Sequence, residues 1–315
     1  MGMIGKLSAA ALLAGAAASA VFWVATRPER LPAAIVSELG AGDAGRGERI
    51  FWAGGCTSCH AAPKSEGEAR LQLPGGAELN TPFGVFVPPN ISQDPVDGIG
   101  GWTVEDFANA MMRGVSPEGE HYYPAFPYTS YARMKPQDVA DLYAYMKTLP
   151  ATPGAAADHR LGFPFTVRRG LGLWKLLYLS DEPVVDFPAG APDLVLAGRY
   201  LAEGPGHCGE CHTPRDMLGG AEKARWLSGA AAAEGEGIVP NITPGEGGLK
   251  WSTSEIADYL ETGFTPEFDS VGGAMVEVQK NMAKLPQEDR DAIAAYLKAI
   301  PPHPDGYPAR QPAAN

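Results

Sequence analysis

The sequence predicts a mainly α-helical protein in which two tandem copies of one domain follow an N-terminal apolar helix. Three observations predict this organisation: a Cys-x-x-Cys-His pentapeptide occurs twice, the same series of residues follows each copy, and an uncharged run lies near the N-terminus. With 315 residues the chain is long enough for two domains of ordinary size. Its 39 glycines and 29 prolines predict many loops between short helices.

Residues 1–30 are predicted to be an N-terminal membrane anchor or a signal segment. Leu7–Thr26 contain no charged residue, and about 20 helical residues cross the ~30 Å hydrocarbon layer of a bilayer. The small residues at 16–20 resemble a cleavage site, which leaves a cleaved signal as the alternative. Because the apolar run continues through Trp23 and Val24, we favour an uncleaved membrane helix.

The two pentapeptides contain all four cysteines and read Cys56-Thr-Ser-Cys59-His60 and Cys208-Gly-Glu-Cys211-His212. This pattern is typical of c-type haem attachment, in which both cysteines bind the porphyrin through thioethers and the histidine ligates the iron. Zinc ribbons place their cysteine pairs about 15–20 residues apart, and a redox disulfide needs no following histidine, so both alternatives are disfavoured. The sequence therefore predicts two covalently bound haems, with His60 and His212 as axial ligands.

Matching residues follow the two pentapeptides in one order. They are Val87-Pro-Pro-Asn90 and Val239-Pro-Asn241, then Trp102 and Trp251, then Gly114 and Gly263, and finally Asp138–Lys147 and Asp289–Lys298. Each tryptophan precedes its glycine by 12 residues. We interpret this repetition as domain 1 over residues 36–150, a linker over 151–192, domain 2 over 193–303 and a tail over 304–315. The repeated asparagines are expected to make structural contacts.

Each copy is predicted to be mostly helical. Thr103-x-x-Asp106 and Ser252-x-x-Glu255 resemble capping boxes, which begin helices. Apolar residues recur at helical spacing over 142–149 and 293–300, just before Pro150 and Pro301. We expect each of these terminal helices to pack on the helix before its pentapeptide, over Gly45–Phe51 or Leu196–Leu201.

The order of haem motif, ligand loop and terminal helix resembles class I cytochrome c. More specifically, three segments resemble the multihaem cytochrome c subunits of membrane-bound bacterial alcohol and gluconate dehydrogenases: His207–Arg215, Tyr123–Tyr131 and Phe163–Phe165. The resemblance covers about residues 40–300. It implies an electron-transfer role beside a dehydrogenase. Those subunits usually carry three haem domains, whereas this chain has cysteines for two.

A methionine is expected opposite each histidine, because His–Met ligation raises the haem potential and suits electron transfer. In the second copy we favour Met275, which lies in a glycine-rich loop, over Met282, which is interpreted as a core residue. In the first copy the related subunits often have methionine in the Tyr-Pro-Ala-Met-Pro-Tyr loop, where this chain has Phe126. Met134 is our first choice there, and His121, which gives bis-His ligation, is the alternative.

The leading functional hypothesis is a dihaem electron carrier on the periplasmic side of the bacterial inner membrane, or soluble in the periplasm if the N-terminal segment is cleaved. Its expected partners are a dehydrogenase subunit as donor and a cytochrome or oxidase of the respiratory chain as acceptor. The alternative is a dihaem oxidoreductase that acts on peroxide or a small sulfur compound at an open first haem. Because the net charge is −12, a nucleic acid partner is disfavoured.

Overall fold

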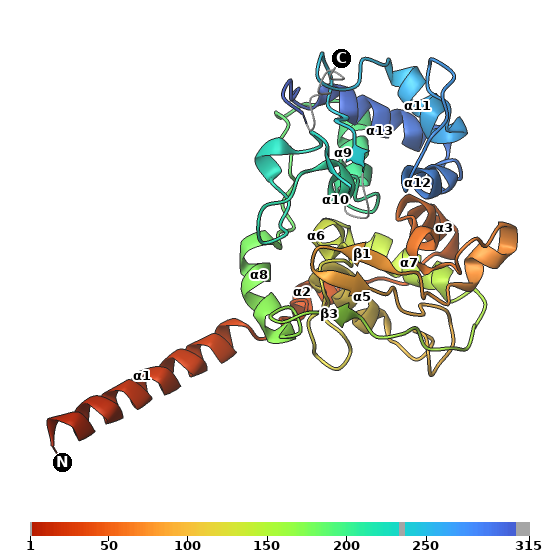
Figure 1. Cartoon of the computed structure of the whole chain (residues 1–315). Helices are drawn as coiled ribbons and strands as arrows, with labels where there is room; N and C mark the ends of the chain where they lie inside the picture. Colours follow the sequence, from red (N-terminus) through yellow and green to blue (C-terminus); the bar gives the residue numbers. More distant parts are fainter. Residues whose placement is uncertain (1, 233–236, 307–315) are drawn as a thin grey trace.

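Two helical halves follow one extended N-terminal helix (Figure 1). The computed structural model describes residues 2–232 and 237–306, and of residues 3–9 it describes the backbone. The N-terminal helix α1, Met3–Ala25, projects away from the rest of the chain. Among the residues searched in the described part of the chain, no helix combines the length and the apolar character that crossing a membrane requires.

The first half begins with the short helix α2, Ala33–Val36, and centres on two crossing helices, α3 (Ala44–Ala53) and α7 (Pro136–Met146). The other elements of this half are α4 (Cys56–His60), the 3₁₀ helix η1 (Gly67–Gln72), β1 (Leu79–Thr81), β2 (Gly84–Phe86), α5 (Val104–Arg113) and α6 (Tyr128–Tyr131). The predicted capping box of Thr103 and Asp106 starts α5, and Gly114 ends it in the left-handed conformation.

The second half repeats this plan with α9 (Asp193–Glu203) crossing α13 (Gln287–Ala299). Its other elements are α10 (Gly209–His212), η3 (Lys223–Arg225), β4 (Ala230–Ala231), β5 (Ile238–Val239), α11 (Thr253–Thr262) and α12 (Met275–Met282). Ser252 and Glu255 form the capping box of α11, and left-handed Gly263 ends it. The predicted capping-box starts of α5 and α11 are therefore confirmed. The terminal helix α13 ends just before Pro301 as predicted, whereas α7 already ends at Met146.

A glycine allows the helices of each pair to touch. A Cβ at Gly47 would overlap the Asp141 carbonyl, and a Cβ at Gly198 would overlap the Ala292 carbonyl. The two contacts correspond: each member of the second pair lies 151 residues after its counterpart. The predicted packing of the terminal helices on the helices before the pentapeptides is confirmed.

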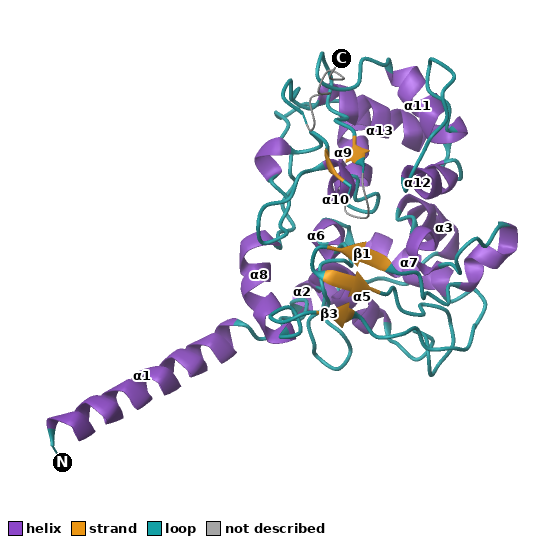
Figure 2. Cartoon of the chain, in the orientation of Figure 1, coloured by secondary structure: helices purple, strands orange, loops and turns teal. Residues whose placement is uncertain are grey.

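The linker contributes structure to both halves. Its strand β3, Arg160–Leu161, pairs with β2 to complete a three-stranded antiparallel sheet in the order β1-β2-β3 (Figure 2). After the 3₁₀ helix η2, Arg168–Gly170, the helix α8, Leu171–Tyr178, places Trp174 so that its Nε1 donates to the Leu218 carbonyl at 3.0 Å. The linker therefore contacts both halves.

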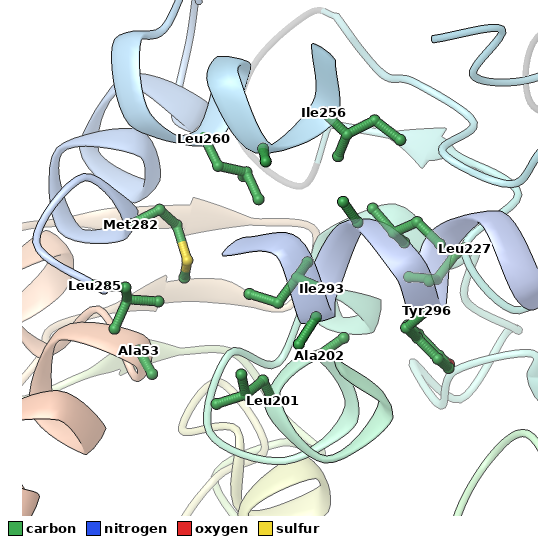
Figure 3. Close-up of a cluster of buried hydrophobic side chains, with 14 of the residues drawn as sticks. Ala53, Leu201, Ala202, Leu227, Ile256, Leu260, Met282, Leu285, Ile293 and Tyr296 are labelled. Carbon is green, nitrogen blue, oxygen red and sulfur yellow. The ribbon is translucent and has the colours of Figure 1, made fainter. Parts of the chain in front are cut away.

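Each half has its own buried hydrophobic cluster, and the two clusters meet at α3. The second cluster is built from α9, α11, α12 and α13, and it includes Ala53 from the end of α3 (Figure 3). Trp52 packs against both clusters. The residues just before the first pentapeptide therefore lie between the halves.

Candidate functional site

Each pentapeptide begins at a tight turn after a long helix. Residues 56–60 form the single-turn helix α4 behind α3, and α10 follows α9 in the same way. The turn residue before the first cysteine is left-handed in both places: Gly55 has φ 57° and His207 has φ 39°. One helical turn brings both cysteines and the histidine of each pentapeptide to one short stretch of backbone.

The two pentapeptide histidines have the same hydrogen-bond partner in each half. His60 Nδ1 lies 2.8 Å from the Pro89 carbonyl oxygen, and His212 Nδ1 lies 2.8 Å from the Pro240 carbonyl oxygen. A carbonyl partner makes Nδ1 the protonated nitrogen and leaves Nε2 with a lone pair for a metal. Burial lowers the pKa of both imidazoles, which favours the neutral, ligating form.

The first cysteine of each pentapeptide lies where burial disfavours a thiolate. Burial raises the pKa of Cys56 and of Cys208 to about 12. Structural zinc is bound by thiolates, and the searched residues of the described chain contain no group of three or more His, Cys, Asp or Glu side chains arranged for a metal ion. An apolar setting with a neutral imidazole fits a covalently attached haem and does not fit a zinc cluster.

The loops that supply the proline carbonyls are held by the repeated asparagines. Asn90 Nδ2 donates to the carbonyls of Thr152 and Gly154 at 2.7 and 2.9 Å, beyond the end of α7. Asn241 Nδ2 donates to the Gly247 carbonyl at 2.9 Å and to the His303 carbonyl at 2.7 Å, beyond the end of α13. The predicted structural contacts of these asparagines are confirmed, and they fix the carbonyl that orients each histidine.

The segments that follow α5 and α11 show which residues of the two halves correspond. The Tyr122 N–H donates to the Gly114 carbonyl, and the Val271 N–H donates to the Gly263 carbonyl. The two turns therefore align residue by residue. Four residues beyond each donor lie Phe126 and Met275. Met275 begins α12, is partly buried and packs against the second cluster. The first half therefore has an aromatic ring where the second half has Met275.

The other proposed ligands lie in different surroundings. Met134 is 3% exposed in the first cluster, one residue before the N-cap of α7, as Leu285 is before that of α13. His121 is also 3% exposed, and its Nε2 lies 2.9 Å from the Thr26 carbonyl oxygen at the base of α1. Met282 is buried within the second cluster (Figure 3). The assignment of Met134, with His121 as its alternative, stays a prediction.

The residues between the cysteines of each pentapeptide contact the opposite half. The Thr57 hydroxyl donates to Asn281 Oδ1 at 2.8 Å, and Asn281 Nδ2 donates to the Ser58 hydroxyl at 3.0 Å. In the other direction, Glu210 accepts hydrogen bonds from the Thr129 and Ser130 hydroxyls at 2.9 and 2.8 Å. Each pentapeptide is thus held by a short helix of the other half, the first by α12 and the second by α6 (Figure 1).

Sequence reasoning missed several of these residues. The sequence marks Pro89 and Pro240 only as part of a repeated loop, in which a proline precedes each repeated asparagine. Asn281 and Glu210 gave no signal, because their partners lie far away along the chain. Arg215, three residues after the second pentapeptide, donates to Glu210 at 2.5 Å.

The sequence is similar to those of known proteins. The Cytochrome c family matches residues 44–150. The chain is 56% identical over 290 residues to a dihaem cytochrome c-type protein of Cereibacter sphaeroides, across 92% of this chain and 95% of that protein. It is also 34% identical over 259 residues to the fructose dehydrogenase cytochrome subunit of Gluconobacter japonicus, across 81% of this chain and 52% of the relative.

A further relative is the cytochrome c subunit of alcohol dehydrogenase (quinone) of Gluconobacter oxydans, which is 34% identical over 274 residues, across 83% of this chain and 55% of the relative. The chain spans about half the length of these two dehydrogenase subunits. Together with the match to the Cereibacter protein, which extends over nearly the whole of both chains, these similarities show that the chain belongs to the cytochrome c family.

Proposed function

We propose that this protein is a dihaem electron carrier built from two tandem class I cytochrome c domains, residues 36–150 and 193–303. The protein carries two covalently bound c-type haems. We assign the first to Cys56 and Cys59 with His60 as axial ligand, and the second to Cys208 and Cys211 with His212. The observation that carries this assignment is the pair of 2.8 Å contacts between each histidine Nδ1 and a proline carbonyl.

A c-type haem, when bound, supplies a reversible one-electron change of its iron. The residues of this chain hold and tune it. The proline carbonyl makes each imidazole a stronger ligand, and the asparagine behind it keeps that carbonyl in place. On the distal side we assign Met275 to the second haem and Met134 to the first, with His121 as the alternative. A thioether ligand favours the reduced iron and a higher potential.

The donor that we propose is a dehydrogenase subunit, and the acceptor is a cytochrome or oxidase of the respiratory chain. Support comes from the fructose and alcohol dehydrogenase cytochrome subunits to which the chain is similar. In this proposal the two haems are the redox groups. The protein then passes single electrons rather than transforming a substrate itself.

We place the protein on the periplasmic side of the inner membrane, with α1 as its anchor. Support comes from the uncharged run Leu7–Thr26 and from the contacts at the base of α1. Thr26 is fully buried there, and its hydroxyl accepts a hydrogen bond from Arg169 Nε at 3.0 Å. The Arg169 guanidinium also lies 4.1 Å from the centroid of the Trp23 ring. These contacts join the anchor to the linker beside α8.

The ligand set tests the carrier proposal. In the oxidised full-length protein we expect two low-spin haems, each with a sulfur-to-iron charge-transfer band in the near infrared. Met275→Ala and Met134→Ala are each expected to remove one band, whereas Met282→Ala, as a matched core control, retains both. Loss of the first haem's low-spin spectrum in His121→Ala would assign that ligand to His121 instead.

A second candidate function is favoured by Phe126, which stands where the second half has Met275. If no side chain of the first half ligates the iron opposite His60, the first haem binds small molecules and acts as an oxidoreductase on peroxide or a small sulfur compound. Carbon monoxide binding to the reduced first haem, together with a high-spin oxidised spectrum, would establish this alternative and exclude the simple carrier.

A further inference from the structure

His207 lies between the two haem-attachment segments and contacts both. It directly precedes Cys208, and its Nε2 lies 3.2 Å from the carbonyl oxygen of Gly54, two residues before Cys56. Its ring also packs edge-on against Tyr131, with 5.7 Å between the centroids. Tyr131 and Cys56 both belong to the first buried cluster or pack against it. One side chain of the second half therefore reaches the first pentapeptide.

The backbone conformation of His207 is unfavourable for a residue that carries a side chain. Its φ of 39° lies in the left-handed region, which favours glycine over residues with a Cβ. The corresponding residue of the first half is Gly55, with φ 57°. The turns are equivalent: each residue donates its N–H to the carbonyl three residues before it and accepts from the N–H three residues after it.

The local turn alone therefore calls for glycine at position 207. An imidazole there adds nothing to the turn, because the ring makes its contacts with Gly54 and Tyr131 in the other half. His207 is held in an unfavourable backbone conformation, yet its side chain makes no contact that its own turn requires. This combination points to a role between the halves.

We propose that His207 is the positioning residue for electron exchange between the two haems, an inference that rests on the proposed function. With Nε2 protonated, it donates to the Gly54 carbonyl and completes a continuous bonded route. The route runs from the Cys208 attachment through His207 and the hydrogen bond to Gly54, Gly55 and Cys56. One electron crosses it, one iron is oxidised and the other is reduced, and no atom or proton is transferred.

The test compares His207→Gly with the native protein, both as full-length dihaem chains. One haem is reduced by a light-triggered electron donor, and the rate of equilibration with the other haem is followed by absorbance. We expect a several-fold lower rate in His207→Gly. We also expect a denaturant unfolding midpoint that is equal or higher, because glycine relieves the left-handed strain. A purely structural role predicts that rate and stability fall together, and that outcome would overturn the proposal.

Tyr200→Phe provides the matched control. Tyr200 donates to Asp138 across the same interface, away from the pentapeptides. Its loss is expected to leave the equilibration rate unchanged. His207→Gln, whose amide restores a donor, is expected to recover part of the rate.

If His207→Gly retains two low-spin haems and its equilibration rate is unchanged, the inference is refuted. Failure of the proposed function itself is recognised separately, because the native protein would then lack the two low-spin haems or show no equilibration between them. The midpoint potentials of both haems serve as a further readout. They are expected to stay the same in His207→Gly, since neither the axial histidines nor their proline partners are altered.

Discussion

Single polar residues hold the helix pair of the first half together. The carboxylate of Asp141 on α7 is fully buried and accepts four hydrogen bonds. They come from the Asp43 N–H at 2.7 Å, from Arg46 Nε and Nη2 at 2.6 and 2.9 Å, and from Gln137 Nε2 at 2.8 Å. The second half has Ala292 at the corresponding position, so this network belongs to the first half alone.

We predict that Asp141→Asn reduces the free energy of unfolding at neutral pH by roughly 1–2 kcal/mol, because a charged acceptor is lost and the exposed partner Arg46 limits the effect. Burial raises the pKa of Asp141, but the hydrogen bonds from Arg46, Asp43 and Gln137 outweigh it and hold the pKa below its ordinary 3.8. Its stabilisation is therefore complete above this value and is lost as the pH falls through the folded pKa.

Denaturant unfolding across the acid range checks this prediction. The Asp141→Asn protein should lose less stability below about pH 4 than the native protein. Glu118→Gln, at an exposed residue, is the control and should follow the native curve. If the unfolding free energy of Asp141→Asn falls with pH in parallel with that of the native protein, titration of Asp141 does not contribute to the acid dependence of stability.

At the scale of elements, each half depends on close contact between the helix before its pentapeptide and the helix that ends it. Gly47 and Gly198 allow this contact, because a side chain at either position would meet backbone rather than a flexible group. Backbone cannot move aside without separating the helices. The same contact brings α3 and α9 to the cluster that surrounds each pentapeptide.

Gly198→Ala is predicted to destabilise the second half by about 1–3 kcal/mol or more, because the added methyl group overpacks the α9–α13 crossing. Gly47→Ala is predicted to do the same at α3–α7. Thermal unfolding followed by circular dichroism measures both effects. Gly170→Ala is the control: the φ of Gly170 is −60° and a Cβ there meets nothing within 4 Å, so the variant should be neutral or slightly stabilised.

The helices were largely predictable, whereas the contacts between halves were not. Capping boxes at Thr103 and Ser252 and the left-handed glycines Gly114 and Gly263 are local signals, and the structure follows them. The haem pentapeptides are local too. By contrast, β3 is only two residues long and exists because β2 offers it an edge. Asn281 and Glu210 meet partners more than 70 residues away, and no periodicity marks such a contact.

At the scale of the whole molecule, the two halves face each other in an approximately two-fold arrangement. Arg49 on α3 forms a bidentate pair with Asp289 on α13, at 2.5 Å for both contacts. Tyr200 on α9 corresponds to Arg49, and Asp138 on α7 corresponds to Asp289. These two residues form the reciprocal contact, in which Tyr200 donates to Asp138. Two further contacts follow the same reciprocal pattern: Asn281 on α12 accepts from Thr57 of the first pentapeptide, and Glu210 of the second pentapeptide accepts from Ser130 on α6.

Arg49→Met is predicted to weaken docking of the halves by roughly 1–3 kcal/mol, because it leaves Asp289, only 7% exposed in its side chain, without its charged partner. Calorimetry of the dihaem protein measures this. We expect a single unfolding transition in the native protein and a broadened or divided one in the variant. Arg160→Met, which removes an exposed pair with Glu78, is the control and should leave one transition.

The same reciprocal contacts have a consequence for how the protein is made. Thr57 is only 2% exposed because Asn281 of the opposite half covers it, although it lies between the two cysteines of its pentapeptide. Haem attachment at Cys56 and Cys59 takes place on either side of this covered threonine. We therefore expect attachment at the first pentapeptide to precede the contact between Thr57 and Asn281, so that haem insertion and docking of the two halves are linked steps.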